Sequence, residues 1–389
     1  MGYGPIEAVI GNIDKGLTSL GHRSIVACSA DSEVTGSRYA TVPHSLGDYL
    51  RAGTSAGQTT VTLHLAKALE RARRGDIDVI HMHEWLERVY DRSFDPPVPI
   101  VMTLHVPACH SGIEKRCERV EIAPTRPAVQ FVAISEYQRR EYADRLTVAA
   151  TVGHGIDVQQ YRFQAEADAT NYLFSIARIT RVKGQDTAIE VARRSGSKLI
   201  LAGCVQDKPD DRAFFEELKR SVDLVVDVAR HPVNGAYYEQ VMKPLLSCPQ
   251  QIIYVGELDT EAKKHWYRRA KATLFPVRWG EPFGMVLIES MACGTPILAF
   301  REGAVPEIVA HGDTGLIVAS LTGMIEGVER IDRIDRRRCR ADVMERFSIQ
   351  RMAEGYADLY GSLAGLPSYR STPRMIRSPV ETSELVSAS

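Results

Sequence analysis

Short apolar runs alternate with longer segments of helical periodicity along most of the chain. The runs "SIVACS", "DVIHMH", "PIVMTLHV" and "QFVAIS" lie within residues 22–135, and "YLFSIA", "LILAGC", "IIYVGE", "ATLFPV", "PILAF" and "GLIVA" lie within residues 171–319. Runs that are apolar throughout predict strands buried on both faces, as in parallel sheets covered by helices. The pattern therefore predicts an α/β protein with two doubly wound domains.

The periodicity also suggests where the domains end. It breaks in the polar stretch "HGIDVQQYRFQAEADAT", so we expect an N-terminal domain over residues 1–160 and a C-terminal domain over 165–348. Apolar residues spaced by three and four in "MAEGYADLYGSL" predict a further helix over 349–366. The Ser- and Pro-rich segment 367–389 has few apolar residues, which predicts disorder.

Composition narrows the class of protein. The 389 residues include 48 basic and 49 acidic side chains, a net charge of −1 that does not favour binding to nucleic acid. No apolar run reaches the roughly 18 residues needed to span a bilayer, and the first residues lack the pattern of a signal peptide. The seven cysteines are scattered and odd in number. We therefore expect reduced thiols, a cytoplasmic location and no stable membrane insertion.

The stretch "EPFGMVLIESMACGTP" places two carboxylates, Glu281 and Glu289, in an otherwise uncharged segment. The surrounding pattern predicts a strand, a loop, a helix beginning near Gly284, and another strand. The free N–H groups at the start of such a helix favour an anion or a polar ligand, and both carboxylates could reach the same crevice. The alternative is that Glu281 caps the helix and Glu289 forms a salt bridge on an exposed face.

A second candidate is the segment "ARITRVKGQD", in which Arg178 directly follows a predicted strand and Lys183 comes five residues later. Cations at the carboxyl end of a parallel strand lie where such sheets bind ligands, and their charge matches a diphosphate. The alternative is a pair of solvated loop cations.

Histidines end two predicted strands of the first domain: His81 and His83 end one, and His105 ends the next. The carboxyl ends of neighbouring parallel strands share an edge, so these rings are expected near the cleft. No suitably spaced carboxylates accompany them, and we expect no bound metal. At the chain start, Gly4 precedes a predicted helix in a glycine-containing turn that can contact a phosphate.

Taken in order, these segments resemble the family 4 retaining glycosyltransferases of GT-B architecture. The most specific similarity is the E-x7-E motif, here Glu281 to Glu289, followed by "SMACGTPILA" and "GAVPEIVAHGDTGLIV". "ARITRVKG", "VAISEYQRR" and "GHGID" at 153–157 are similar to further family segments, the last standing where the family often has Asn-Gly-Ile-Asp. The resemblance implies two Rossmann-like domains with a cleft between them and a C-terminal helix returning to the first domain.

The resemblance also implies how a nucleotide-sugar donor is held. Glu281 is expected to hydrogen-bond a hydroxyl of the donor sugar, and Glu289 the ribose of the nucleotide. The backbone N–H groups of Phe283, Gly284 and Met285 are expected to meet sugar and phosphate oxygens.

The remaining roles concern the leaving group and the attack face. The resemblance implies that Arg178 and Lys183 hold the diphosphate, that His105 lies beside the sugar, and that Gly4 lies close to the phosphates. The family often has two adjacent glycines where this chain has Gly4 followed by Pro5, which departs from the pattern. No cofactor is implied.

The implied activity is hexosyl transfer from a nucleotide diphosphate sugar, with UDP as the expected carrier, to a small soluble acceptor. A lipid acceptor stays open because Lys67, Arg71 and Arg74 lie on one predicted helix. Two other functions stay open on the same scaffold: a nucleotide-sugar epimerase and a non-catalytic nucleotide-sugar-binding protein. Transfer is expected to be metal-independent, because the Asp-x-Asp at Asp76–Asp78 opens a predicted strand.

The family normally has a strand before the first glycine turn, and Met1 stands where that strand would already have ended. We therefore expect the natural protein to begin roughly 10 to 20 residues upstream, the length of a strand and its loop.

Overall fold

The computed structural model describes residues 5–45, 55–84, 95–108 and 129–365. The phosphate contact expected of Gly4 and the disorder expected of 367–389 lie outside these residues, and both stay predictions. The expected upstream strand also stays a prediction.

Helices and parallel strands alternate in the N-terminal half, which we define as residues 5–160. Its elements are α1 (Pro5–Ser19), β1 (Ile25–Ser29), β2 (Ser37–Val42), α3 (Ser55–Arg73), β3 (Ile80–Met82), β4 (Ile100–Thr103), β5 (Val129–Ala133), α5 (Glu136–Tyr142), β6 (Val148–Thr151) and a short 3₁₀ turn (Val158–Gln160). Among the described residues, β1 pairs with β2, and a separate four-stranded sheet has the order β3-β4-β5-β6. All neighbouring strands are parallel, so the residues that follow β3, β4 and β5 share one edge.

The C-terminal half, residues 161–348, contains a larger sheet. Its strands are β7 (Leu173–Ile176), β8 (Leu199–Ala202), β9 (Leu224–Val225), β10 (Ile252–Tyr254), β11 (Ala272–Phe275), β12 (Ile297–Phe300) and β13 (Gly315–Val318). Its helices and helical turns are η4 (Arg181–Lys183), α6 (Gln185–Ser195), α7 (Pro209–Lys219), η5 (Tyr238–Met242), α8 (Lys243–Ser247), α9 (Thr260–Arg269), α10 (Met285–Ala292), α11 (Val305–Ile308), α12 (Leu321–Arg330), η6 (Ile331–Arg333) and α13 (Arg336–Arg346).

The strand order of this sheet determines where a ligand can bind. The described strands lie in the order β13-β12-β11-β7-β8-β10-β9, and each neighbouring pair is parallel. The chain starts at β7 and builds outward through β8, then returns to the other side of β7 through β11. The order therefore reverses between β7 and β11, and open α/β sheets have a ligand-binding crevice at such a point.

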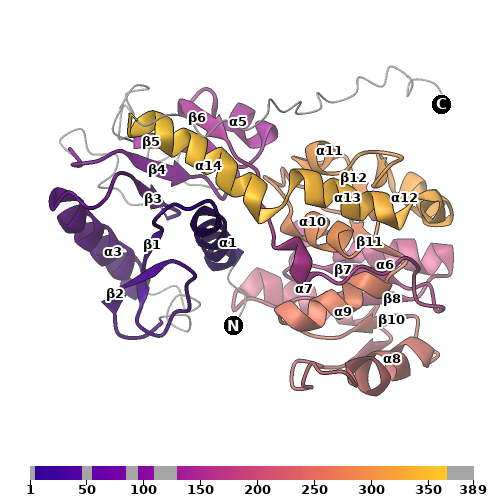
Figure 1. Cartoon of the computed structure of the whole chain (residues 1–389). Helices are drawn as coiled ribbons and strands as arrows, with labels where there is room; N and C mark the ends of the chain where they lie inside the picture. The colour runs from indigo at the N-terminus through magenta and orange to yellow at the C-terminus, as the bar shows by residue number, and fades with distance from the viewer. Residues whose placement is uncertain (1–4, 46–54, 85–94, 109–128, 366–389) are drawn as a thin grey trace.

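The helix α14 (Ile349–Leu363) leaves the C-terminal half and packs against α1 (Figure 1). Val9 and Ile13 of α1 share a buried cluster with Met352 and Tyr356 of α14. The two helices approach closely at Gly16, where an added Cβ would lie 2.6 Å from the Cβ of Ala353. The two ends of the described chain thus contribute to one core.

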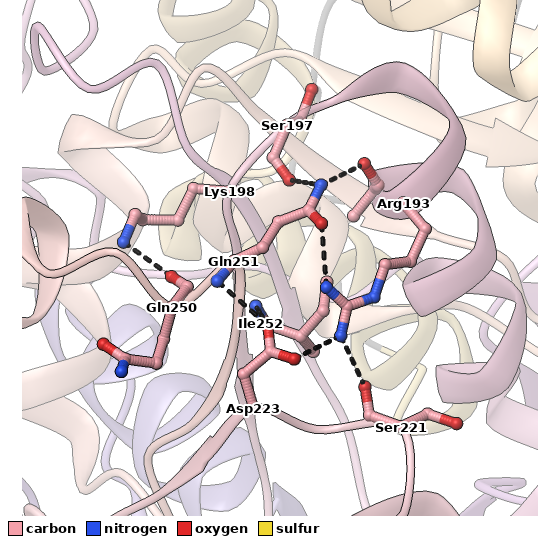
Figure 2. A network of polar contacts seen from close by, with 9 residues as sticks. Arg193, Ser197, Lys198, Ser221, Asp223, Gln250, Gln251 and Ile252 are labelled. Atoms are coloured by element: carbon pink, nitrogen blue, oxygen red, sulfur yellow. Dashed lines mark hydrogen bonds and ion pairs between the residues drawn. The ribbon is translucent and has the colours of Figure 1, made fainter.

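A polar network joins the amino ends of β8, β9 and β10 (Figure 2). The Asp223 carboxylate accepts hydrogen bonds from the backbone N–H groups of Gln251 (2.9 Å) and Ile252 (2.8 Å), and it pairs with Arg193. The Gln251 side chain accepts a hydrogen bond from Arg193 Nη1 (2.8 Å), and Lys198 Nζ donates to the carbonyl of Gln250 (2.8 Å). This network lies at the amino ends of the strands, whereas open α/β sheets bind ligands at the carboxyl ends, which indicates a structural role.

The predicted α/β class with parallel sheets is confirmed, and the described strands form three such sheets. Strands β2, β6 and β9 were not expected from the sequence, and each lies at one edge of its sheet, with at most one fully buried residue. An edge strand pairs on one side only, so it can form without a continuous apolar run. Within the residues placed by the structure, no helix is long and apolar enough to cross a membrane. The cysteines of this part are free thiols, and Cys109 and Cys117 lie outside it.

Candidate functional site

A buried ion pair joins the two loops at the reversal point of the C-terminal sheet. Lys183 Nζ, after β7, lies 2.5 Å from Glu281 Oε2, after β11, and the two side chains are 13% and 12% exposed. Trp279 Nε1 donates a hydrogen bond to the same oxygen (3.0 Å), and the Lys183 ammonium lies 4.6 Å from the centre of the Trp279 ring. Two segments that the sequence presented separately therefore form one cluster.

Glycines allow these loops to approach each other. Gly184 has a φ of +71°, and a Cβ there would lie 2.1 Å from the carbonyl oxygen of Pro276. Gly303 has a φ of +54°, and a Cβ there would lie 2.2 Å from the carbonyl oxygen of Glu281. That carbonyl accepts a hydrogen bond from the N–H of Ala304 (2.9 Å). Larger residues at either glycine would move the loop that carries Glu281.

Arg178 lies beside this cluster at the end of β7. Its Nη1 donates a hydrogen bond to Gln206 Oε1 (2.6 Å), and the residue lines a cavity of about 520 Å³. Lys208, Asp210 and Asp211 also line the cavity, so its walls carry both signs of charge. The alternative of two solvated loop cations is therefore wrong for Lys183, which is largely shielded from solvent and paired, whereas Arg178 lines a cavity.

The second carboxylate of the motif is buried in α10. Glu289 is 6% exposed and pairs with Lys263 Nζ at 2.5 Å. It also accepts hydrogen bonds from the hydroxyls of Tyr267 (3.2 Å) and Tyr161 (3.4 Å), and burial, followed by the Glu289 charge, raises the pKa of both phenols well above the usual value. The alternative of an exposed salt bridge for Glu289 is wrong, because the side chain faces the interior.

The start of α10 presents backbone N–H groups to the loop that precedes it. Gly284 precedes the helix with a φ of +93°, and no side chain caps it. The alternative that Glu281 caps the helix is therefore wrong. The first N–H groups of a helix have no partner within the helix, so those near Met285 are oriented towards the same loop.

The N-terminal half contributes a row of histidine rings. His83 Nδ1 and His105 Nε2 are 2.9 Å apart, and the His105 ring stacks on that of His154 with centres 5.4 Å apart. The edge contact between His154 and Phe283 follows at 5.0 Å. His105 is thus separated by one ring from the loop that carries Glu281.

These histidines are neutral at pH 7. Burial lowers the pKa of His105 to about 4, and burial together with the nearby His105 lowers the pKa of His81 to about 3. Burial also lowers the pKa of His83 and of His154 well below the usual value. Within the described residues His154 Nδ1 is buried without a protein partner, whereas His81 Nδ1 meets the Tyr360 hydroxyl at 2.6 Å.

The structure brings together most of the predicted site, and Gly4 lies outside the described residues. The residues in direct contact with it that were missed include Trp279, Lys263 and His154. Trp279 lies in the same loop as Glu281, and His154 lies in "GHGID", so both were within segments already singled out. Lys263 had no sequence signal, because nothing in its helix indicates that it faces Glu289.

Metal binding by the histidines has no geometric support in the described part of the chain, where no group of three or more His, Cys, Asp or Glu side chains is placed to hold an ion. Asp76 of the Asp-x-Asp segment instead pairs with Arg71 Nε at 2.8 Å.

Two family models match the chain. Residues 157–338 match the model "Glycosyl transferases group 1", and residues 6–160 match the model "Glycosyltransferase Family 4". A D-inositol 3-phosphate glycosyltransferase from Pseudarthrobacter chlorophenolicus is 24% identical over 288 residues, which are 65% of this chain and 62% of that relative. The chain therefore spans less than two thirds of the length of this curated relative.

Solved structures of glycosyltransferases share the fold. AviGT4, involved in avilamycin A biosynthesis, has a TM-score of 0.61 at 20% identity, covering 95% of this chain and 92% of that one. HepE from Anabaena, solved in complex with UDP and glucose, has a TM-score of 0.63 at 18% identity, covering 92% and 96%. These similarities establish the GT-B architecture. Since the two family models together match residues 6–338, the protein belongs to the family 4 glycosyltransferases.

Proposed function

We propose that this protein is a retaining glycosyltransferase that moves a hexosyl group from a UDP-linked sugar to a small soluble acceptor in the cytoplasm. The observation that carries the proposal is the buried Lys183–Glu281 pair at the reversal point of the sheet, next to the Arg178 cavity. A solved relative of the same fold is in complex with UDP-glucose, which supports the choice of donor.

The proposed chemistry requires the protein to stabilise the departing diphosphate. Negative charge builds on that group in the transition state, and preorganised cations and helix N–H groups are the usual means of stabilising it. Arg178, Lys183 and the start of α10 supply these charges. We assign no covalent nucleophile, and the departing diphosphate oxygen takes the proton of the acceptor hydroxyl on the same face of the sugar.

The donor contacts follow from the same assignment. Glu281 accepts a hydrogen bond from a sugar hydroxyl and Glu289 from the ribose, while the N–H groups of Phe283, Gly284 and Met285 meet sugar and phosphate oxygens. His105 lies at the attack face, where a neutral ring hydrogen-bonds the sugar without adding charge.

The first test measures donor binding and transfer. Thermal melting against a panel of nucleotide sugars should show the largest rise in midpoint with a UDP-hexose, since a ligand at a hundred times its Kd stabilises the fold by about 2.7 kcal/mol. Product should then form only when an acceptor is added. Product without an acceptor would indicate an epimerase, and protection without any product a binding protein.

Transfer should survive EDTA. Arg178 and Lys183 neutralise the diphosphate, so a divalent cation is not needed for that purpose. Rates are measured with and without the chelator, and then after metal is added back. Complete inhibition that metal reverses would contradict the proposal.

Glu281→Gln and Glu289→Gln should have different effects. Glu281→Gln replaces a charged acceptor of the sugar hydroxyl with a neutral amide, so transfer should fall by about 10²- to 10³-fold while the affinity for UDP changes little. Glu289→Gln weakens the ribose contact in the same way, and the affinity for UDP should fall by about tenfold. Calorimetric titration with UDP measures both, with the exposed Glu329→Gln as the control. An equal loss of UDP affinity in both variants would contradict this division of roles.

Stability should fall as the pH drops below about 6.5. Burial depresses the pKa of His105 to about 4, so between these values the unfolded chain binds a proton that the folded chain does not. The contribution of neutral His105 to the unfolding free energy is fully present above pH 6.5 and is lost as the pH falls through the folded pKa. His105→Gln should therefore flatten the pH dependence of the unfolding free energy by up to about 1.4 kcal/mol per pH unit. Urea unfolding at pH 7.5 and 5.5 measures the unfolding free energy of the unaltered protein and of His105→Gln. The same change with pH in both proteins would refute the prediction.

A further inference from the structure

The segment that follows β5 contacts both halves of the molecule. We define the cross-domain turn as residues 135–138, the Ser-Glu-Tyr-Gln that opens α5. Ser135 Oγ donates a hydrogen bond to the carbonyl oxygen of Pro282 (2.6 Å), which lies between Glu281 and Phe283. Ser135 is 3% exposed, so this bond is shielded from solvent. We call the loop that carries Glu281, Pro282 and Phe283 the donor loop. One hydroxyl of the N-terminal half therefore holds this loop of the C-terminal half.

A carboxylate of the C-terminal half reaches back to the same turn. Glu307 in α11 accepts hydrogen bonds from the backbone N–H groups of Glu136 (2.8 Å) and Tyr137 (2.5 Å), one on each oxygen. Burial raises the pKa of Glu307, while the two N–H groups and Arg140, whose Nη2 is 3.8 Å away, act in the opposite sense. Arg346 donates a hydrogen bond to the Glu307 carbonyl and so fixes the backbone that carries the carboxylate.

The last residue of the turn, Gln138, holds the loop that carries His105. Gln138 is fully buried, and its Nε2 donates hydrogen bonds to the carbonyls of Leu104 and Val106, both at 3.1 Å. These two residues flank His105. The Oε1 of Gln138 accepts a hydrogen bond from the N–H of Ile134 (2.9 Å), so the Gln138 side chain links the ends of β4 and β5. The backbone on both sides of His105 is therefore held from the same turn that contacts the donor loop.

We propose that the cross-domain turn is a positioning element. Its Ser135, together with Glu307 of α11, which binds the turn, sets the closure of the two halves, and its Gln138 aligns His105 with the donor loop. The proposal rests on the function proposed above, because it assigns the donor to the C-terminal half and the attack face to His105. Close packing at the same contact supports it. A Cβ on Gly280 would lie 2.1 Å from the Tyr137 hydroxyl, and one on Gly153 would lie 3.2 Å from the Phe283 ring.

This arrangement predicts which kinetic constant responds. The carboxylates Glu281 and Glu289 and the N–H groups of residues 283–285, which we assign to the donor, all lie in the C-terminal half, so loosening the turn leaves these contacts within one half. Loosening the turn moves His105 and the rest of the N-terminal half away from the donor. A small misplacement of reacting groups strongly lowers the rate of the chemical step. The kcat should therefore fall while the KM for the donor changes little.

The test uses Ser135→Ala and Glu307→Gln in the full chain, with Glu329→Gln on the exposed face of α12 as the matched control. Gln at 307 keeps the side-chain shape but can accept only one of the two N–H hydrogen bonds. Each variant should lower kcat by about tenfold with the donor KM changed by less than about twofold. The double variant should lose less than the product of the two effects, because both bonds hold the same closed state. Glu329→Gln should match the unaltered protein.

A second measurement does not depend on activity. Small-angle X-ray scattering without ligand should give a larger radius of gyration for Ser135→Ala and Glu307→Gln than for the control. Gln138→Met should lower kcat without changing the scattering, because its bonds lie within one half. Unchanged kcat, or unchanged scattering in both Ser135→Ala and Glu307→Gln, would overturn the proposal. If the unaltered protein transfers no sugar, the proposed function fails, and the scattering comparison still decides whether the turn holds the halves together.

Discussion

The ion pair between Lys183 and Glu281 is the interaction around which the site is built. Removing two charges from water is costly, and their attraction offsets that cost only with good geometry and additional hydrogen bonds. Here Trp279 supplies both a hydrogen bond to the carboxylate and a ring face for the ammonium. The pair also requires the two loops to meet, which depends on the absence of a side chain at Gly184 and at Gly303. The ion pair therefore depends on the contact between the two loops, and that contact depends on the strand order that places β7 beside β11.

The N-terminal half is organised by a different constraint, the burial of polar rings. His81 meets hydroxyls of Thr103 and Tyr360, and His83 meets His105, so these imidazoles are satisfied as neutral groups rather than as cations. Tyr360 belongs to α14, the helix that crosses from the C-terminal half (Figure 1). The position of His81 thus depends on a helix that follows the C-terminal half in the chain. Combined with the cross-domain turn, the histidine row places neutral donors and acceptors opposite a charged cluster.

The fold was predictable where burial dominates the sequence pattern. Strands β4, β8, β11 and β12 are buried along their whole length, and each was visible as a continuous apolar run. The edge strands β2, β6 and β9 were not, because a strand with one neighbour leaves part of its surface exposed and tolerates polar residues. The π-helical turn η5 also had no signal, since its hydrogen-bond pattern is not encoded in a hydrophobic period.

For the site, the sequence by itself determined which residue types lie at the carboxyl ends of the central strands. The spacing of Glu281 and Glu289, and the position of Lys183 after a strand, can be read directly from the chain. Only the tertiary structure decided what each charge faces: Lys183 pairs with Glu281, 98 residues away, and Lys263 pairs with Glu289. It also decided that Ser135 meets Pro282, and Glu307 the backbone of Glu136, across the two halves. Local spacing fixes the element on which a side chain lies, whereas its partner depends on how separate elements pack, and that information is distributed over the whole chain.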